Sequence, residues 1–185
     1  MKYIIEHMDE EMYEWCILEY KHISSIVGKE NLIFTNVKKG AEKIKNLGAV
    51  HTKSISKMNF DKICVLDMDA KEVLRTADKQ KFEYFVFGGI LGNNPPQKRT
   101  QKLIKSLKCE TKHLGNKQMS TDTAVLAAKM ILEGKKIEEI EFTDTIMIPI
   151  KKGEEVILPY RYILKDDKIM LAPGIVQMLK KQKGF

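Results

Sequence analysis

The stretch YFVFGGILGNNPPQKRT, residues 84–100, decides how this chain is expected to fold. It begins with four β-branched or aromatic residues, and such a run bounded by glycine predicts a buried strand. Gly88, Gly89 and Gly92 follow. Glycine permits positive φ and has no Cβ, so a ligand or another backbone segment can come close to the main chain. We therefore expect a binding loop at the carboxyl end of this strand, although a tight turn without a ligand would use the same glycines.

The order of the glycines argues against two common phosphate sites. The pattern G-G-x-x-G differs from the G-x-G-x-x-G of dinucleotide sites and from the G-K-[ST] of P-loops. Pro95 and Pro96 also separate the glycines from the next predicted helix, so a phosphate would have no adjacent helix N-terminus.

Outward from this stretch, predicted strands alternate with predicted helices. We expect strands at residues 2–6, 32–35, 63–66, 84–87 and 109–113, and helices at 12–27, 37–47, 96–107 and 121–133, with Gly28 as a left-handed cap. This alternation predicts an α/β fold, a parallel sheet covered by helices on both faces. Ligands of such sheets bind at the carboxyl ends of the strands. Three segments are therefore expected to line one crevice: residues 66–68, the glycine loop and residues 114–120.

Two carboxylates are candidates for chemistry. Ser120 or Thr121 can cap the helix that follows, and Asp122 lies in its first turn, where the dipole favours an anion; helix capping alone explains Asp122 equally well. Glu19 falls within the apolar stripe of the 12–27 helix, and a buried carboxylate needs a partner or a use. An ion pair with Arg99 or a lysine is one explanation, and a place in the substrate pocket is the other.

Composition limits the class of protein. A chain of 185 residues with 43% apolar content can form one substantial core. The absence of a long apolar run and the early acid at Glu6 predict a cytoplasmic protein with no membrane association.

Neither cysteine nor histidine predicts a metal centre. The three cysteines are far apart in the sequence, which favours buried thiols over disulfides or a metal site. The four histidines show no ligand spacing. We therefore expect no metal.

The net charge of +7 is concentrated in one part of the sequence. Seven basic residues stand against the single acid Glu110 between positions 98 and 117: Lys98, Arg99, Lys102, Lys105, Lys108, Lys112 and Lys117. A helix that begins at Pro96 places Lys98, Lys102 and Lys105 on one face. This Lys98 to Lys117 patch predicts binding to the phosphates of RNA or of a ribosomal particle, and a solvated lysine face is the alternative.

The last fifty residues change in character. Residues 140–150 and 154–164 read as strands, residues 169–171 follow a turn, and residues 175–181 read as a short helix. Pro149 and Pro159 predict strand edges. We expect a core at 1–134 and an antiparallel, β-rich extension at 135–185 packed on it.

Several longer motifs point to a known family. They are MKYIIEHM at the N-terminus, Glu14-Trp15 with Leu18-Glu19-Tyr20, FGGILG at 87–92, LGNKQMSTDTAV at 114–125, and PYRY at 159–162. In these motifs the chain resembles the SPOUT superfamily of S-adenosylmethionine-dependent methyltransferases. The resemblance is to the branch that contains the eukaryotic ribosomal-protein arginine methyltransferase, and it covers almost the whole chain. Asn93 and Lys98 depart from it, because acidic residues are common at these positions.

The resemblance implies a deep trefoil knot, which ordinary chain rules treat as essentially absent. It also implies that S-adenosylmethionine binds inside the knot, with main-chain groups of Leu114, Gln118 and Met119 bonded to the adenine. The full set of implied cofactor residues is Leu66, Asp67, Met68, Gly88, Gly89, Ile90, Gly92, Leu114, Gly115, Gln118, Met119 and Thr121.

The acceptor of the methyl group remains open at this level. An arginine of a small-subunit ribosomal protein would need carboxylates, for which Glu19 and Asp122, with Glu6 behind them, are the candidates. Arg99, Lys98 and Lys102 are the candidates for substrate binding. An RNA base or ribose in rRNA or tRNA is the alternative acceptor, favoured by the basic patch. A catalytically silent RNA- or ribosome-binding module is a further alternative.

Overall fold

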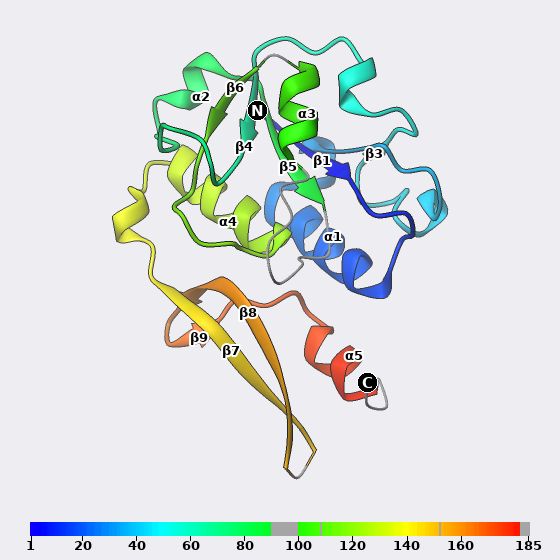
Figure 1. Cartoon of the computed structure of the whole chain (residues 1–185), viewed down its shortest axis with the longest axis vertical. Helices are drawn as coiled ribbons and strands as arrows, with labels where there is room; N and C mark the ends of the chain where they lie inside the picture. Colours follow the sequence, from blue (N-terminus) through cyan, green and yellow to red (C-terminus); the bar gives the residue numbers. More distant parts are fainter. Residues whose placement is uncertain (90–99, 108, 152, 182–185) are drawn as a thin grey trace.

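The computed structural model describes residues 1–89, 100–107, 109–151 and 153–181, without the side chain of Lys102. Its main sheet has six parallel strands in the order β3-β2-β1-β5-β4-β6 (Figure 1). The strands are β1 (Lys2–His7), β2 (Leu32–Thr35), β3 (Ala49–Val50), β4 (Ile63–Leu66), β5 (Tyr84–Gly89) and β6 (Glu110–Lys112). The predicted parallel α/β sheet is therefore confirmed.

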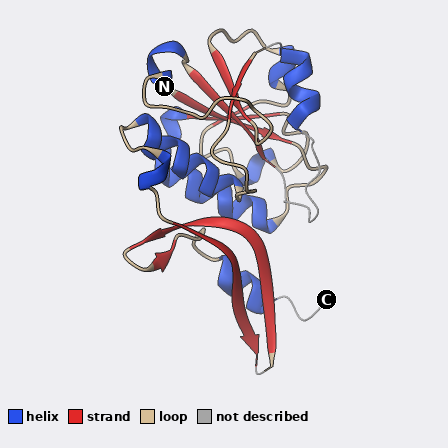
Figure 2. Cartoon of the chain, turned by 60° about the vertical axis from the view of Figure 1, so that its left-hand side comes forward, coloured by secondary structure: helices blue, strands red, loops and turns tan. Residues whose placement is uncertain are grey.

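Both faces of this sheet are covered, which explains why its strands are apolar at consecutive positions. Tyr3 and Ile5 point into one core with the helices α1 (Glu14–Val27) and α4 (Thr121–Leu132). Ile4, between them, points into a second core with α3 (Thr100–Leu107) and the short 3-10 helix η3 (Ile55–Lys57). Figure 2 shows helices both above and beneath the fan of parallel strands.

The remaining short elements connect these parts. They are the helix α2 (Asp78–Lys81) and the 3-10 helices η1 (Lys29–Asn31), η2 (Ala41–Lys43) and η4 (Ile137–Glu139). None of the helices in the described part of the chain is long and apolar enough to cross a membrane.

The C-terminal extension forms a separate antiparallel sheet of β7 (Phe142–Lys151), β8 (Glu154–Lys165) and β9 (Lys168–Ile169), followed by α5 (Ile175–Lys181). The long β7–β8 hairpin projects away from the main sheet, and α5 packs on one of its faces (Figures 1 and 2). Pro149 lies on the edge strand β7, and Pro159 lies in the part of β8 that β9 does not reach.

The helix predicted at residues 37–47 is wrong. Asn36 and Gly40 adopt positive φ values of 60° and 75°, so only the single turn η2 forms before β3, which the sequence did not predict. Val37 and Ile44 are fully buried. Their spacing of seven residues fits two helical turns, which is why the pattern imitated a helix.

Two glycine predictions also need correction. Gly28 ends α1 with φ 80° and ψ 139°, a positive φ that lies outside the left-handed helical region. Gly88 and Gly89 do not form a turn, because β5 continues through both of them. A Cβ on Gly89 would lie 2.5 Å from both Ile5 Cγ2 and Tyr20 Oη, so the missing side chain at this position makes room for the protein's own core.

The end of β6 is hydrogen-bonded on two sides to the segment that follows β4. On one side Asp67 N donates to Lys112 O at 2.9 Å. On the other side His113 N donates to Glu72 O at 2.9 Å, and Leu74 N donates to His113 O at 3.0 Å. Residues 112–113 therefore lie between the two arms of the loop that follows β4. This arrangement agrees with a threaded chain, and the trefoil knot itself stays a prediction.

Gly89→Ala tests the close packing of β5. We expect it to lower the free energy of unfolding by about 1–3 kcal/mol, because neither Ile5 nor the buried Tyr20 ring can move aside cheaply. Denaturant unfolding measures this change. Gly88→Ala is the matched control, since its Cβ would come no closer than 3.1 Å, to Thr100 Oγ1. Equal stability of the two variants would contradict the packing argument.

Candidate active site

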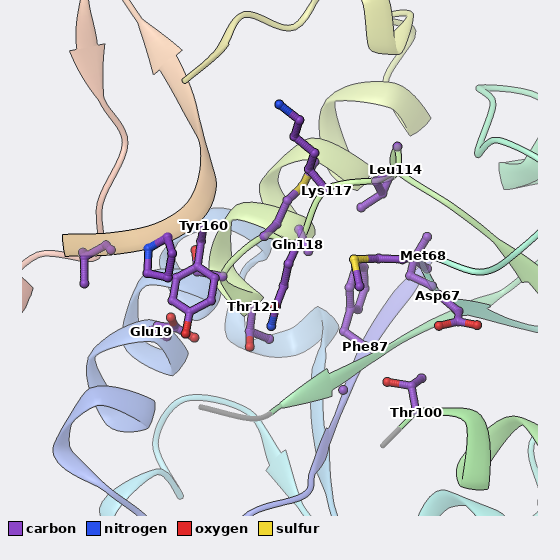
Figure 3. A pocket seen from close by; sticks show the side chains of 18 of the residues that line it. Glu19, Asp67, Met68, Phe87, Thr100, Leu114, Lys117, Gln118, Thr121 and Tyr160 are labelled. Atoms are coloured by element: carbon purple, nitrogen blue, oxygen red, sulfur yellow. The ribbon is translucent and has the colours of Figure 1, made fainter. Parts of the chain in front are cut away.

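A cavity of about 540 Å³ opens where β4, β5 and β6 end (Figure 3). Pockets for small organic ligands typically measure about 300–1,000 Å³, so this one can enclose a cofactor-sized molecule. Three chain segments form its walls as the strand order predicted: the end of β4, the end of β5, and the loop between β6 and α4.

Most of the residues predicted to bind a cofactor line this cavity. They are Leu66, Asp67, Met68, Gly88, Leu114, Gly115, Gln118, Met119 and Thr121. Gly89 is not among the lining residues, for it is buried in the core behind the strand end. Ile90 and Gly92 lie outside the described residues. The cavity thus brings the predicted segments together, while the role of each residue stays a prediction.

The sequence reasoning missed one wall of the cavity. Residues 157–160 of β8 close it from the C-terminal extension, and Trp15 of α1 adds an aromatic side chain. No periodicity links β8 to strands a hundred residues earlier. The motif PYRY at 159–162 was the only signal, and it indicated the family without indicating a place in the site.

Backbone pairing attaches this wall to the cofactor loop. Arg161 N donates to Gln118 O at 2.8 Å, and Met119 forms a parallel bridge with Arg161. Asp144 of β7 reinforces the junction, since its carboxylate accepts from Arg161 Nε at 2.8 Å and also pairs with Lys117. These bonds hold the pKa of Asp144 near 2, below its usual range. The carbonyl of Gln118, a residue whose main chain is predicted to bond an adenine, already accepts one hydrogen bond and retains one lone pair.

Glu19 lies on the cavity wall and is only 5% exposed. Trp15 Nε1 donates to Glu19 Oε1 at 2.7 Å, and Thr121 also hydrogen-bonds the carboxylate. Burial raises the pKa of Glu19 well above its usual range, and the nearby Asp122 raises it further. Figure 3 shows the Tyr160 ring beside Glu19. The arrangement is a buried carboxyl group, held by donors and facing a cavity, which is suited to accepting a proton or a cationic group.

Asp122 is buried behind Glu19 and does not line the cavity. Its Oδ1 accepts from Ser120 Oγ at 2.7 Å and from Thr123 N at 2.9 Å, and its Oδ2 lies 2.8 Å from His22 Nδ1. These contacts support the first turn of α4, one of the two roles considered for this residue. Its negative charge acts on Glu19, and a catalytic role of Asp122 itself stays a prediction.

Glu6 is also buried at a distance from the cavity lining. Its Oε2 accepts from Thr35 Oγ1 and, at 3.1 Å, from the backbone N–H of Ile55. The carboxylate thus holds the start of η3 against the ends of β1 and β2. A catalytic role of Glu6 stays a prediction.

Two described residues of the patch predicted from Lys98 to Lys117 are engaged in ion pairs. Lys112 is buried between Glu72 and Asp78, with its Nζ 2.6 Å and 3.4 Å from their carboxylates. Lys117 is paired with Asp144. Lys105 of α3 is exposed as expected. Lys98, Arg99 and Lys108 lie outside the described residues, and Lys102 is described only as part of α3. In the parts of the chain that the structure describes, no three or more His, Cys, Asp or Glu side chains gather as a metal site would require.

Comparison with known proteins identifies the family. The model of the SFM1-like protein arginine N-methyltransferases matches residues 2–184. The chain belongs to this family. The protein arginine N-methyltransferase SFM1 of Saccharomyces cerevisiae is 38% identical over 205 residues, which cover 100% of this chain and 96% of the yeast protein.

Solved structures agree with the family assignment. The crystal structure of yeast SFM1 complexed with SAH matches with a TM-score of 0.89 at 36% identity and covers 97% of this chain and 94% of that one. The complex with SAM matches with the same TM-score at 37% identity and covers 97% and 90%. The dual-specific Trm10 from Thermococcus kodakaraensis shares the fold alone, with a TM-score of 0.57 at 18% identity over 75% of this chain and 96% of that one. The predicted SPOUT resemblance is confirmed.

The buried Glu19 carboxyl predicts a distinctive dependence of stability on pH in this family member. Its folded-state pKa is raised, so the native state keeps a proton that the unfolded chain has already released. We therefore expect the free energy of unfolding to fall as pH rises through the interval between the ordinary and the raised pKa. Glu19→Gln should remove this loss and gain about 1 kcal/mol or more at pH 8.

Urea unfolding of both proteins at several pH values measures the effect. Glu14→Gln is the matched control, because Glu14 is exposed in the first turn of the same helix. Parallel curves for the wild type and Glu19→Gln would show that Glu19 does not hold a proton in the folded state.

Proposed function

We propose that this chain binds S-adenosylmethionine in the cavity and transfers its methyl group to an arginine of a small-subunit ribosomal protein. The observation that carries the proposal is the buried Glu19 carboxylate, which faces a cofactor-sized cavity in a chain of the arginine methyltransferase family. The relatives crystallised with SAM and SAH support the choice of cofactor.

The residues present fit this cofactor. Leu66, Phe87 and Ala124 supply apolar walls for an adenine ring. Asp67 and Asp69 place two acidic residues on the cavity wall, and their negative charge favours a ligand that carries a positive sulfur. Gly88 lines the wall without a side chain, which leaves the cavity open at the end of β5.

When bound, S-adenosylmethionine supplies a methyl group on a positively charged sulfur, which is already a good leaving group. What the chain must add is alignment of the acceptor nitrogen and exclusion of water. Trp15 and residues 157–160 enclose the cavity on the side of α1 and β8, so an arginine side chain that enters beside Tyr160 meets Glu19.

Glu19 has two tasks in this mechanism. The bound guanidinium cation favours the ionised form of Glu19, so the carboxyl releases its proton to water as the arginine enters. The carboxylate then accepts hydrogen bonds from the guanidinium, whose planar N–H groups match two carboxylate oxygens. The attacking nitrogen forms a bond to the methyl carbon as the carbon–sulfur bond breaks, and the guanidinium then releases one proton. Arginine keeps its charge at neutral pH, so this proton leaves during or after transfer. Glu19, with its raised pKa, is placed to take it.

The ribosomal part of the proposal rests on charge and on the family resemblance. A chain with a net charge of +7 is suited to a partner rich in phosphate. The carboxylate at Glu19 favours a guanidinium over a nucleobase as the acceptor, so we place RNA at the surface and arginine in the cavity. A cytoplasmic location stays a prediction.

Labelled methyl transfer tests the acceptor. We expect label from S-adenosylmethionine to enter the protein fraction of hypomethylated small ribosomal subunits, and acid hydrolysis to release it as methylarginine. Subunits from cells that contain the enzyme are the control and should take up little label. Label found only in the RNA would overturn the proposed substrate.

Glu19→Gln tests the mechanism. The amide keeps the volume and can still accept from Trp15, but it cannot take a proton, so we expect kcat to fall by about 10²–10⁴-fold. Calorimetry should show S-adenosylmethionine affinity within about threefold of the wild type, because the cofactor lies against other walls. Glu14→Gln should behave as the wild type. Undiminished turnover in Glu19→Gln would remove Glu19 from the mechanism.

A further inference from the structure

The segment between β2 and β4 carries a second concentration of positive charge. Residues 36–62 contain seven lysines, at positions 38, 39, 43, 45, 53, 57 and 62, against the two acids Glu42 and Asp61. All seven lysines are exposed. Lys39 pairs with Glu11 and Lys62 with Glu83, and the other five lysines exceed the two acids of this segment by three charges.

The loops that carry these lysines are firmly built. The segments after β2 and β3 are joined by Asn36 N to Lys53 O at 2.8 Å and Val37 N to His51 O at 3.1 Å. Ile55 is fully buried, and its N–H is held by the Glu6 carboxylate. Lys53 and Lys57, which flank Ile55, therefore project from a fixed backbone.

A hollow of about 420 Å³ lies beside Lys53 and Lys57, and we name it the η3 hollow. It is lined by His51, Thr52, Lys53, Lys57, Met58 and Asn59. This described lining includes no carboxylate, and it offers two ammonium groups, a hydroxyl and an amide. Donors of this kind around an open hollow suit phosphate oxygens.

Helix α3 connects the η3 hollow to the active-site cavity. Thr100, at its first turn, lines the cavity. Further along, Leu103 packs with Ile55 and Phe60 in one apolar cluster, so α3 lies against η3 (Figure 1). Lys105 is exposed on the same helix. Lys105 thus adds a positive charge beside the lysines of η3, on a helix whose first turn reaches the cavity.

We propose that the η3 hollow and the exposed side of α3 bind the sugar–phosphate backbone of RNA that lies beside the methyl acceptor. Lysines bind phosphates as point charges and need no base sequence, so this surface orients a partner without reading it. The choice of RNA among polyanions rests on the proposed ribosomal substrate. The charge and the shape of the surface are observed independently of that proposal.

Direct binding tests this surface in the absence of any methyl donor. The probe is a fluorescein-labelled RNA hairpin of about 16 base pairs, titrated with the full chain across a range of KCl concentrations. Lys53→Glu with Lys57→Glu should weaken binding at least about tenfold. It should also lower the slope of log K against log[KCl] by about 1.5, the value for two lost phosphate contacts.

The matched control is Lys79→Glu with Lys135→Glu, an equal change of charge at exposed positions on the opposite edge of the sheet. It should bind RNA with nearly wild-type affinity. Lys53→Gln with Lys57→Gln should fall between the two, and circular dichroism should show the same fold for all variants.

Two results would overturn the proposal. One is equal RNA affinity of the two charge-reversed proteins. The other is displacement of the hairpin by poly-glutamate or duplex DNA as readily as by unlabelled RNA, which would assign the surface to acidic proteins or to DNA. Methylation of a free arginine peptide separates this inference from the proposed function. If the peptide is methylated and the RNA is not bound, only the surface proposal fails.

Discussion

The hydrogen bond from Arg161 N to Gln118 O joins the C-terminal extension to the loop that lines the cavity. The parallel sheet brings together the ends of β4, β5 and β6, but these ends form only one side of the site. The bond docks β8 on the loop between β6 and α4, and the ion pairs of Asp144 with Arg161 and Lys117 fix the docked position. The C-terminal extension therefore completes the wall of the pocket, where Tyr160 lies beside Glu19.

The sequence predicted those parts of the structure whose cause is local. Continuous apolar runs such as residues 63–66 and 84–87 indicated strands buried on both faces, and the parallel order then placed the cavity at their carboxyl ends. The helix expected at 37–47 failed because two backbone angles, at Asn36 and Gly40, outweighed a pattern of buried side chains. The β8 wall was not predictable in this way, since a contact between residues 118 and 161 leaves no period in the sequence.

Burial of Glu19 shows how activity and stability oppose each other in this core. An ionised carboxylate among apolar side chains costs free energy, and Asp122 nearby adds repulsion. The hydrogen bonds from Trp15 and Thr121 offset only part of this free-energy cost. A cationic guanidinium would supply the missing partner. The site is therefore least stable when it is empty and ionised, which is why the empty site keeps the proton on Glu19 and a bound cation would favour its release.

The same reasoning separates the two buried glutamates, which the sequence presented as similar candidates. Glu19 faces a cavity and is held by side chains that leave it open to a ligand. Glu6 is not among the residues that line the active-site cavity, and its Oε2 accepts hydrogen bonds from Thr35 and from the backbone of Ile55. Its carboxylate fixes the loop from which Lys53 and Lys57 project. The molecule thus offers the Glu19 carboxyl group to a cationic side chain in the cavity, and Lys53 and Lys57 to phosphate at the η3 hollow. A partner that carries an arginine on a surface of RNA meets opposite charge at both places, whereas a free basic peptide would be repelled by the second. With the RNA surface that we propose, this charge distribution is suited to the proposed ribosomal substrate.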